Sequence, residues 1–209
     1  REEIFKTLKR IDQIMIPGGD PGRLDPDILF EWSATMATLL QKYHPEAKLW
    51  ISPQVFALND AWLKAFYGEV NKEPEWLGGI VFGPWEKASL PELREIIPEK
   101  YPIRNYPDIS HSLHCQYPVP DWDIAFALTL GRECINPRPK AFKHIHNVYE
   151  PYTIGAITYS EGIHDDVNKF VWADQDWNPQ TPVIETLREY SQLFISQQYG
   201  EELAQAFGA

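Results

Sequence analysis

Short apolar runs alternate with amphipathic helical stretches along this chain, and the alternation limits the folds open to it more than any other feature. Each apolar run predicts a buried strand, and the helical stretch after it is reached through a loop rich in Pro, Gly or polar residues. The predicted strands cover residues 11–16, 48–53, 78–85, 101–106 and 153–158. The predicted helices cover residues 4–8, 27–43, 59–70, 90–97 (with Ser89 as its cap), 165–172 and 182–198.

Strands that alternate with helices at this spacing pair in parallel through crossover helices, so the sequence predicts an α/β fold. A doubly wound nucleotide-binding sheet is disfavoured, because the chain has no Gly-x-Gly-x-x-Gly motif and no Walker loop. About five strands are expected, whereas a complete (β/α)8 barrel has eight. We therefore predict the C-terminal portion of a TIM-type barrel, about five βα units, over residues 1–199, and the start of a following helical segment at 200–209. Residues 107–151 are expected to form an irregular loop region over the barrel mouth.

Charge and composition argue against several kinds of partner. The chain has 19 Lys+Arg against 30 Asp+Glu, a formal charge of -11, which repels phosphate backbones and anionic membranes. No apolar run approaches the roughly 20 residues that span a bilayer, so neither nucleic acid nor a membrane is expected. Two cysteines are too few for a disulfide framework. The helical pattern so close to Arg1 suggests a fragment boundary, which leaves the compartment open; secretion or a periplasmic location is expected if the protein is bacterial.

Polar residues that directly follow predicted strands are the candidates for chemistry, since the loops after the strands build the active site of a parallel barrel. Hydrolysis of a glycosidic bond takes two carboxyl groups, one to protonate the leaving oxygen and one to attack C1 or to position water. Glu161 follows the run at 153–158, and Gly162 lets a ligand approach the backbone. Asp20 follows the first run in a Gly-Gly-Asp-Pro-Gly segment. Glu161 and Asp20 are therefore the predicted catalytic pair.

Each acidic candidate also has a structural interpretation. Glu161 can cap the helix that follows it or pair with Arg104, and Asp20 can bond to its own backbone in a turn. Asp165 and Asp166 stand where a helix N-terminus favours acidic side chains, and either can instead bind a sugar hydroxyl.

Aromatic residues make up 13% of the chain, and many stand beside Pro or Gly at predicted strand ends. Such a placement suits a cleft that stacks on the flat faces of sugar rings, although aromatic side chains can also fill a core. His111 and His114 are interpreted as hydrogen-bonding partners of a substrate or as ordinary loop histidines. The predicted substrate-binding residues are Trp85, Tyr106, His111, His114, Trp122, Tyr159, Asp165 and Asp166.

A zinc site is a less favoured interpretation of the histidines and cysteines. Imidazole and thiolate are the ligands that zinc takes, but the spacings match no standard zinc finger, and we expect no metal or other cofactor. A Gly-x-Ser-x-Gly elbow is absent and neither cysteine has a recognisable nucleophile context. The residues concerned are His111, His114, Cys115, Cys134, His144 and His146.

The segment Ser160-Glu161-Gly162-Ile163 resembles the Pro-Glu-Gly-Ile-like end of a strand in the α-N-acetylglucosaminidase family, and Val167, Trp177 and Tyr199-Gly200 follow in that family's order. Residues 48–56 are similar to the family's strand with a Trp and a Gln before a Phe. More loosely, the Gly-Gly-Asp segment resembles one in hexosaminidase-type glycosidases. The resemblance implies Glu161 as the nucleophile and Asp20 as the general acid/base. Ser160 stands where the family has Pro, and Asp20 where it has Glu.

The sequence thus predicts a glycoside hydrolase that removes a terminal hexose, N-acetylated or related, by a two-carboxylate mechanism. The alternative is a carbohydrate-binding protein that derives from a glycosidase barrel and has no turnover, and a zinc-dependent hydrolase is a third hypothesis. A partial barrel leaves two sheet edges uncovered. We therefore expect the missing strands, a partner chain or another element to cover those edges.

Overall fold

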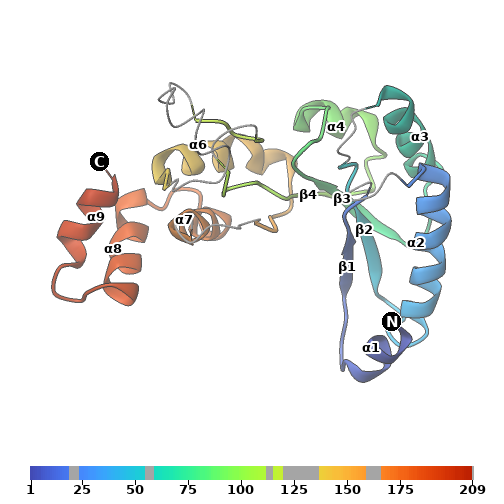
Figure 1. The fold of residues 1–209 in the computed structure, drawn as a ribbon, viewed down its shortest axis with the longest axis horizontal. Helices are drawn as coiled ribbons and strands as arrows, with labels where there is room; N and C mark the ends of the chain where they lie inside the picture. The colour runs from blue at the N-terminus through green and yellow to red at the C-terminus, as the bar shows by residue number, and fades with distance from the viewer. Residues whose placement is uncertain (19–23, 55–58, 112–114, 120–136, 159–165, 209) are drawn as a thin grey trace. The chain divides into compact units, whose positions relative to one another are not determined.

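The computed structural model describes residues 1–18, 24–54, 59–111, 115–119, 137–158 and 166–208. Within these ranges the chain has an α/β fold, as predicted. It divides into two compact units, Arg1–Asn105 and Tyr106–Ala209, and Figure 1 labels the elements of both.

The first unit contains a four-stranded parallel sheet with the strand order β1-β2-β3-β4. In the register, Ile16 lies opposite Ile51, and Phe82 lies opposite Asn105. The first four predicted strands are therefore confirmed. Their bounds are β1 (Gln13–Ile16), β2 (Lys48–Ile51), β3 (Leu77–Phe82) and β4 (Ile103–Asn105).

The sheet is singly wound, with its helices on one face. Crossovers between parallel strands are right-handed, so a strand order that never reverses places successive helices on the same side. Figure 1 shows α2 and α3 on one side of the sheet, whereas a doubly wound sheet reverses its order and covers both faces. The helices of this unit are α1 (Glu2–Thr7), α2 (Pro26–Gln41), α3 (Asp60–Val70) and α4 (Leu90–Ile96).

Local capping explains where two of these helices begin. Ser89 accepts a hydrogen bond from the Glu92 backbone N–H, and the Glu92 carboxylate accepts one from the Ser89 N–H at 2.8 Å. This reciprocal capping box confirms the predicted cap of α4. At the start of α3, Asn59 Oδ1 accepts from the Ala61 N–H at 2.9 Å, which satisfies one of the donors that a helix start leaves open.

An apolar core fills the space between the helices and the sheet. Phe66 of α3 is fully buried, its ring 5.4 Å from Phe30 of α2 in an edge-on contact and 5.2 Å from Trp62 in a stacked one. Such ring pairs add stability beyond the area that they bury. The sheet side of this core comes from the buried residues Leu49, Ile51, Ile80, Phe82 and Ile103.

Trp50 lies across Gly79 of the neighbouring strand, where a Cβ atom would come within 2.4 Å of the ring. The Arg104 guanidinium stacks 4.5 Å from the Trp50 ring centroid and donates to Gln13 Oε1 at 2.7 Å. Gln13, Trp50, Gly79 and Arg104 lie on β1, β2, β3 and β4 in that order, so their contacts connect all four strands. None of the described helices is long and apolar enough to cross a bilayer.

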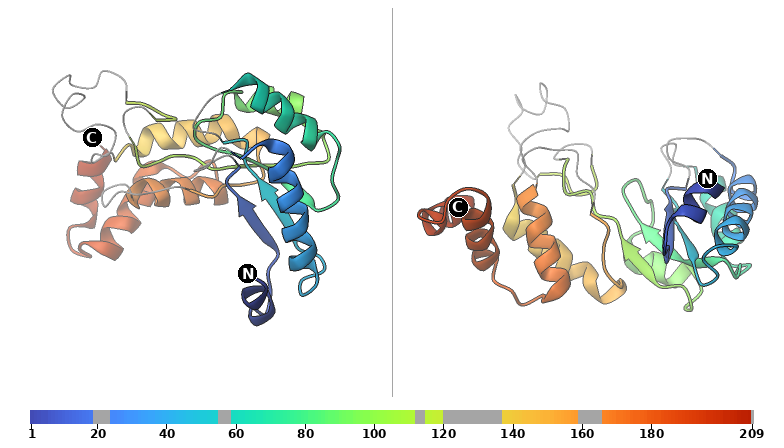
Figure 2. Two further views of the ribbon diagram at one scale, coloured as in Figure 1. Left: turned by 45° about the vertical axis from the view of Figure 1, so that its right-hand side comes forward. Right: turned by 90° about the horizontal axis from the view of Figure 1, so that it is seen from below.

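The second unit is helical in its described part. Helices α8 and α9 form a hairpin near the C-terminus (Figure 2). Leu187 and Tyr190 of α8 pack with Ala204 of α9 and with Val167 of α7. Another cluster joins Ile109 and Tyr117 to the helices α6 and α7. The elements are α6 (Pro139–Tyr149), the 3-10 helix η1 (Glu150–Tyr152), α7 (Asp166–Trp177), α8 (Val183–Phe194) and α9 (Gly200–Gly208).

Two predictions for the second unit are wrong. Residues 153–158 form no strand: only Ala156 takes part in an isolated bridge, and Gly155 adopts φ +121, a conformation foreign to strands of L-residues. Residues 107–151 are not wholly irregular either, because α6 begins at Pro139. A proline fits the first turn of a helix, where its missing N–H would have no helical partner.

Candidate functional site

The carboxyl edge of the sheet in the first unit gathers buried polar side chains, although parallel strands are otherwise apolar. Ser52 and Gln54 follow β2, and Asn105 ends β4; they are 0%, 5% and 2% exposed. Asn105 Oδ1 has no hydrogen-bond partner within the described ranges. A buried carbonyl oxygen costs about 1–3 kcal/mol when it stays unpaired. A donor such as a ligand hydroxyl would recover that energy.

The loop after β1 touches the loop after β2 at this edge. Gly18 has φ +69, and a Cβ atom there would lie 1.9 Å from the Ser52 carbonyl oxygen. The Ser52 N–H donates to the Ile16 carbonyl at 3.0 Å, and Ser52 Oγ accepts from the Gln54 N–H at 3.2 Å. Gly18 is therefore held against Ser52, while Asp20, two residues further along the chain, lies outside the described residues.

Trp85, a predicted stacking platform, follows β3 at the same edge. Its side chain is half-buried, and its backbone has φ +64, a left-handed conformation that few non-glycine residues adopt. Such strain costs about 1–3 kcal/mol and concentrates at functional sites. It supports the role predicted for Trp85, which stays a prediction.

Glu86 follows Trp85 and has a structural role. Its Oε1 accepts hydrogen bonds from Tyr67 Oη at 3.0 Å, the Lys87 N–H at 3.0 Å and the Ala88 N–H at 3.3 Å. Burial raises the pKa of the Glu86 carboxyl, and these donors oppose the rise only in part. The carboxyl ties the loop after β3 to α3.

The raised pKa of Glu86 makes stability depend on pH. A carboxyl with a higher pKa in the folded state binds its proton more tightly there, so its contribution to stability is complete below the unfolded pKa of about 4.5 and is lost as pH rises through the folded pKa. Glu86→Gln keeps the acceptor oxygen and removes the titration. We expect the Tm of the wild type minus that of Glu86→Gln to fall between pH 4 and pH 8. A constant or rising difference would contradict this linkage.

In the second unit, Asp108 holds the ring of His111, a predicted substrate ligand. Asp108 Oδ2 lies 2.7 Å from His111 Nδ1, and Asp108 Oδ1 accepts from the backbone N–H groups of Ser110 and His111 at 3.1 Å each. The Asp108 and His111 side chains are 3% and 2% exposed. The carboxylate therefore fixes the orientation of the imidazole and orders the start of this loop.

Asp108→Ala is expected to lower the free energy of unfolding by about 2 kcal/mol or more, because it leaves buried N–H donors without an acceptor. Asp108→Asn retains an acceptor oxygen for the backbone and should cost less. Urea denaturation of both variants measures the effect. Equal losses in the two would show that the acceptor oxygen is unimportant.

Arg138 and Asn168 close the same loop region onto the helices. The Arg138 guanidinium donates to the Tyr117 carbonyl at 2.6 Å, and its backbone N–H donates to Asn168 Oδ1 at 2.9 Å. Asn168 Nδ2 donates to the Ile109 carbonyl at 3.2 Å. Burial lowers the pKa of Arg138. These bonds tie the described residues Ile109, Tyr117 and Arg138 to one another and to Asn168 of α7.

The histidines and cysteine of the zinc hypothesis have other neighbours. Cys115 Sγ lies 3.3 Å from the His111 carbonyl, and His146 Nε2 lies 3.1 Å from Asp176 Oδ1. Within the described ranges no group of three or more His, Cys, Asp or Glu side chains is placed to hold a metal ion. His114 and Cys134 lie outside those ranges.

Of the remaining predicted site residues, Asp166 and Tyr106 are described. Asp166 begins α7; its Oδ1 accepts from the Val167 N–H at 3.1 Å and its Oδ2 from Tyr190 Oη at 2.7 Å, so both oxygens are engaged within the second unit. Tyr106 is half-buried. The substrate-binding roles of both stay predictions. Outside the described residues lie Asp20, His114, Trp122, Tyr159, Glu161 and Asp165.

The sequence places Ser52, Gln54 and Asn105 among the polar residues that follow or end predicted strands, but it offers no reason to choose them as site residues. Their position directly after or at the end of an apolar run was the available signal. Comparison with known proteins finds no family model, curated protein or solved structure that matches the chain.

Proposed function

We propose that the chain is the carbohydrate-binding part of a (β/α)-barrel glycoside hydrolase that removes a terminal hexose, N-acetylated or related. The observation that carries this proposal is the singly wound sheet, with helices on one face and buried polar side chains at its carboxyl edge. Barrel enzymes build their active sites at that edge. Hydroxyl-rich ligands pair with neutral side chains such as Ser52, Gln54 and Asn105, and Trp85 adds an aromatic face.

The proposal includes elements that complete the barrel. The described part of the chain contributes four strands, and a closed barrel of this kind has eight. Strands β1 and β4 stand at the two edges of the described sheet, and an uncovered edge invites pairing with another strand. We expect further barrel strands or another chain to cover these edges.

The proposed chemistry uses Glu161 and Asp20. The Glu161 carboxylate attacks C1 of the sugar while the bond from C1 to the leaving oxygen breaks, and Asp20 gives its proton to that oxygen. Water then attacks C1, Asp20 takes a proton from it, and the Glu161 carboxylate leaves. This double displacement retains the anomeric configuration and requires carboxyl groups about 5–5.5 Å apart.

A carbohydrate-binding protein without turnover is the second candidate. Two described carboxylates near element ends have structural roles, which favours this candidate. Glu86, after β3, accepts a hydrogen bond from Tyr67, and Asp166, at the start of α7, accepts one from Tyr190. A protein of this class keeps its affinity for sugars when no carboxylate is left for catalysis.

Hydrolysis of aryl α- and β-glycosides, N-acetylglucosaminides among them, separates the two candidates. The enzyme proposal predicts release of the aryl alcohol from at least one member of the panel, at a rate proportional to protein concentration. Calorimetry with the same sugars runs in parallel. Binding without release of the aryl alcohol would favour the binding protein and would contradict the enzyme proposal.

A further inference from the structure

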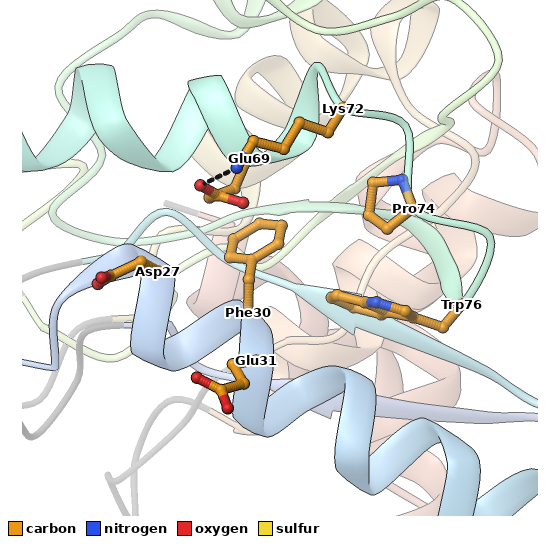
Figure 3. Close-up of a pocket in the computed structure, with 7 residues that line it drawn as sticks. All are labelled: Asp27, Phe30, Glu31, Glu69, Lys72, Pro74 and Trp76. Atoms are coloured by element: carbon orange, nitrogen blue, oxygen red, sulfur yellow. Dashed lines mark hydrogen bonds and ion pairs between the residues drawn. The ribbon is translucent and has the colours of Figure 1, made fainter.

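A cavity of about 350 Å³ lies between α2, α3 and the loop that enters β3. Figure 3 shows the rings of Phe30 and Trp76 together with Pro74 on its walls, and charged side chains around them. Its volume is within the range of small-molecule sites. Trp76 immediately precedes β3, and none of Ser52, Gln54 and Asn105 of the carboxyl edge is among the residues that line the cavity.

The aromatic wall of the cavity is continuous with the core. Phe30 is 6% exposed, its ring centroid lies 5.6 Å from that of Trp76, and the two planes are inclined by 57°. Phe30 also contacts the fully buried Phe66. A wall anchored in this way keeps its shape when no ligand is present.

The loop that carries Pro74 and Trp76 is fixed by three hydrogen bonds from neighbouring elements. Tyr101 Oη donates to the Pro74 carbonyl at 3.0 Å, Lys48 Nζ to the Glu75 carbonyl at 2.8 Å, and the Leu49 N–H to the Trp76 carbonyl at 3.1 Å. A preformed site binds without the entropy loss of ordering a loop. The backbone that carries the Trp76 indole is thus fixed beside the cavity before a ligand binds.

The charged side chains define the chemistry of a ligand. Asp27 and Glu31 stand one turn apart on α2 and are exposed, and on α3 the Glu69 carboxylate pairs with the Lys72 ammonium at 2.6 Å. The excess of carboxylates repels anions, and because Lys72 is paired with Glu69, the exposed carboxylates of Asp27 and Glu31 are left to accept hydrogen bonds from hydroxyl donors. A molecule that carries no negative charge and has an apolar face and several hydroxyl donors matches this lining.

We propose that this cavity binds a neutral pyranose ring, with its C–H face against Trp76 and its hydroxyls donating to Asp27 and Glu31. The choice of a sugar rests on the proposed function. The cavity then serves as a second carbohydrate site, with a lining that shares no residue with Ser52, Gln54 and Asn105, and it holds an oligosaccharide independently of hydrolysis.

The test follows the indole N–H resonance of Trp76 in ¹⁵N-labelled protein, assigned by its loss in Trp76→Phe. The probe is the trisaccharide of N-acetylglucosamine, added to Glu161→Gln protein so that it stays intact. We expect a saturable shift of this resonance, with the affinity lowered about tenfold or more in Glu31→Arg. Glu46→Arg, the same change at an exposed carboxylate outside the cavity lining, should bind as tightly as the parent.

No shift of the Trp76 resonance, or equal affinity in Glu31→Arg, would overturn the site. A shift with choline and none with the trisaccharide would make it a cation site and would overturn it too. The panel of aryl glycosides tests the proposed enzyme activity separately from this site. Saturable sugar binding at Trp76 without hydrolysis would reject the proposed enzyme activity and support this site. Hydrolysis without binding at Trp76 would support the enzyme activity and reject this site.

Discussion

Glu161→Gln is expected to lower kcat on the best aryl glycoside by a factor of about 10³ or more, with Tm unchanged. Gln has the same size and still accepts hydrogen bonds, but its neutral amide is a poor nucleophile towards C1. The lost interaction forms only as the sugar reacts, so kcat and kcat/KM should fall together while KM changes little.

Glu189→Gln is the matched control for this prediction. Glu189 is exposed on α8, and the same exchange of carboxylate for amide there should leave kcat unchanged. Equal activity in Glu161→Gln and the wild type would remove Glu161 from the chemistry. A fall in kcat accompanied by a fall in Tm would indicate the structural interpretation, in which Glu161 caps a helix or pairs with Arg104.

Gly18→Ala is expected to lower the free energy of unfolding by about 2–5 kcal/mol. At φ +69 an alanine is strained by about 1–2 kcal/mol, and its Cβ atom would meet the Ser52 carbonyl oxygen at 1.9 Å. That oxygen belongs to the backbone, so relief requires the loops after β1 and β2 to separate, a further cost of about 1–3 kcal/mol. Urea denaturation followed by circular dichroism measures the change.

Gly68→Ala is the control for the glycine prediction. Gly68 lies in α3, where a Cβ atom would have nothing within 4 Å outside its own helix, so alanine should stabilise the helix by about 0.5–1 kcal/mol. A similar stability change at both positions would contradict the close approach of the two loops. Because Gly18 leads into the Asp20 loop, Gly18→Ala should also lower any hydrolysis at temperatures where it stays folded.

The sequence was sufficient to predict the parts of the fold that depend on local patterns. The first four strands and helices α2, α3 and α4 follow from apolar periodicity and from loops rich in Pro and Gly, and Ser89 caps α4 as expected. These signals lie within a few residues of the element that they define. Parallel pairing then follows from the lengths of the connections.

Features that depend on distant contacts could not be predicted. The apolar residues at 153–158 resemble a strand, but Gly155 takes φ +121 and the segment stays out of the sheet. Pro139 starts α6, although a proline between polar residues is equally typical of a helix end. Pairs such as Tyr67 with Glu86 join residues on separate elements, and a single sequence carries no record of such contacts.

The candidate site likewise has features that the sequence could predict and features that it could not. Position after a strand indicated Trp85, whose strained backbone supports a functional role. The position after a strand did not show that Ser52, Gln54 and Asn105 are stronger candidates than other polar residues. Their burial, and the lack of a partner for Asn105 Oδ1 among the described residues, are properties of the folded protein. The engagement of both Asp166 oxygens likewise depends on Tyr190, far along the chain.

Trapping of a glycosyl–enzyme intermediate offers the decisive test of Glu161 as the attacking group. The protein is incubated with a slowly reacting fluoroglycoside of its best substrate, quenched and digested, and its peptides are analysed by mass spectrometry. We predict one glycosyl unit on the peptide that contains Glu161, attached to that carboxylate, and no label in Glu161→Gln. Hydrolysis with the sugar on another carboxylate, or with no labelled peptide at all, would contradict the proposed mechanism.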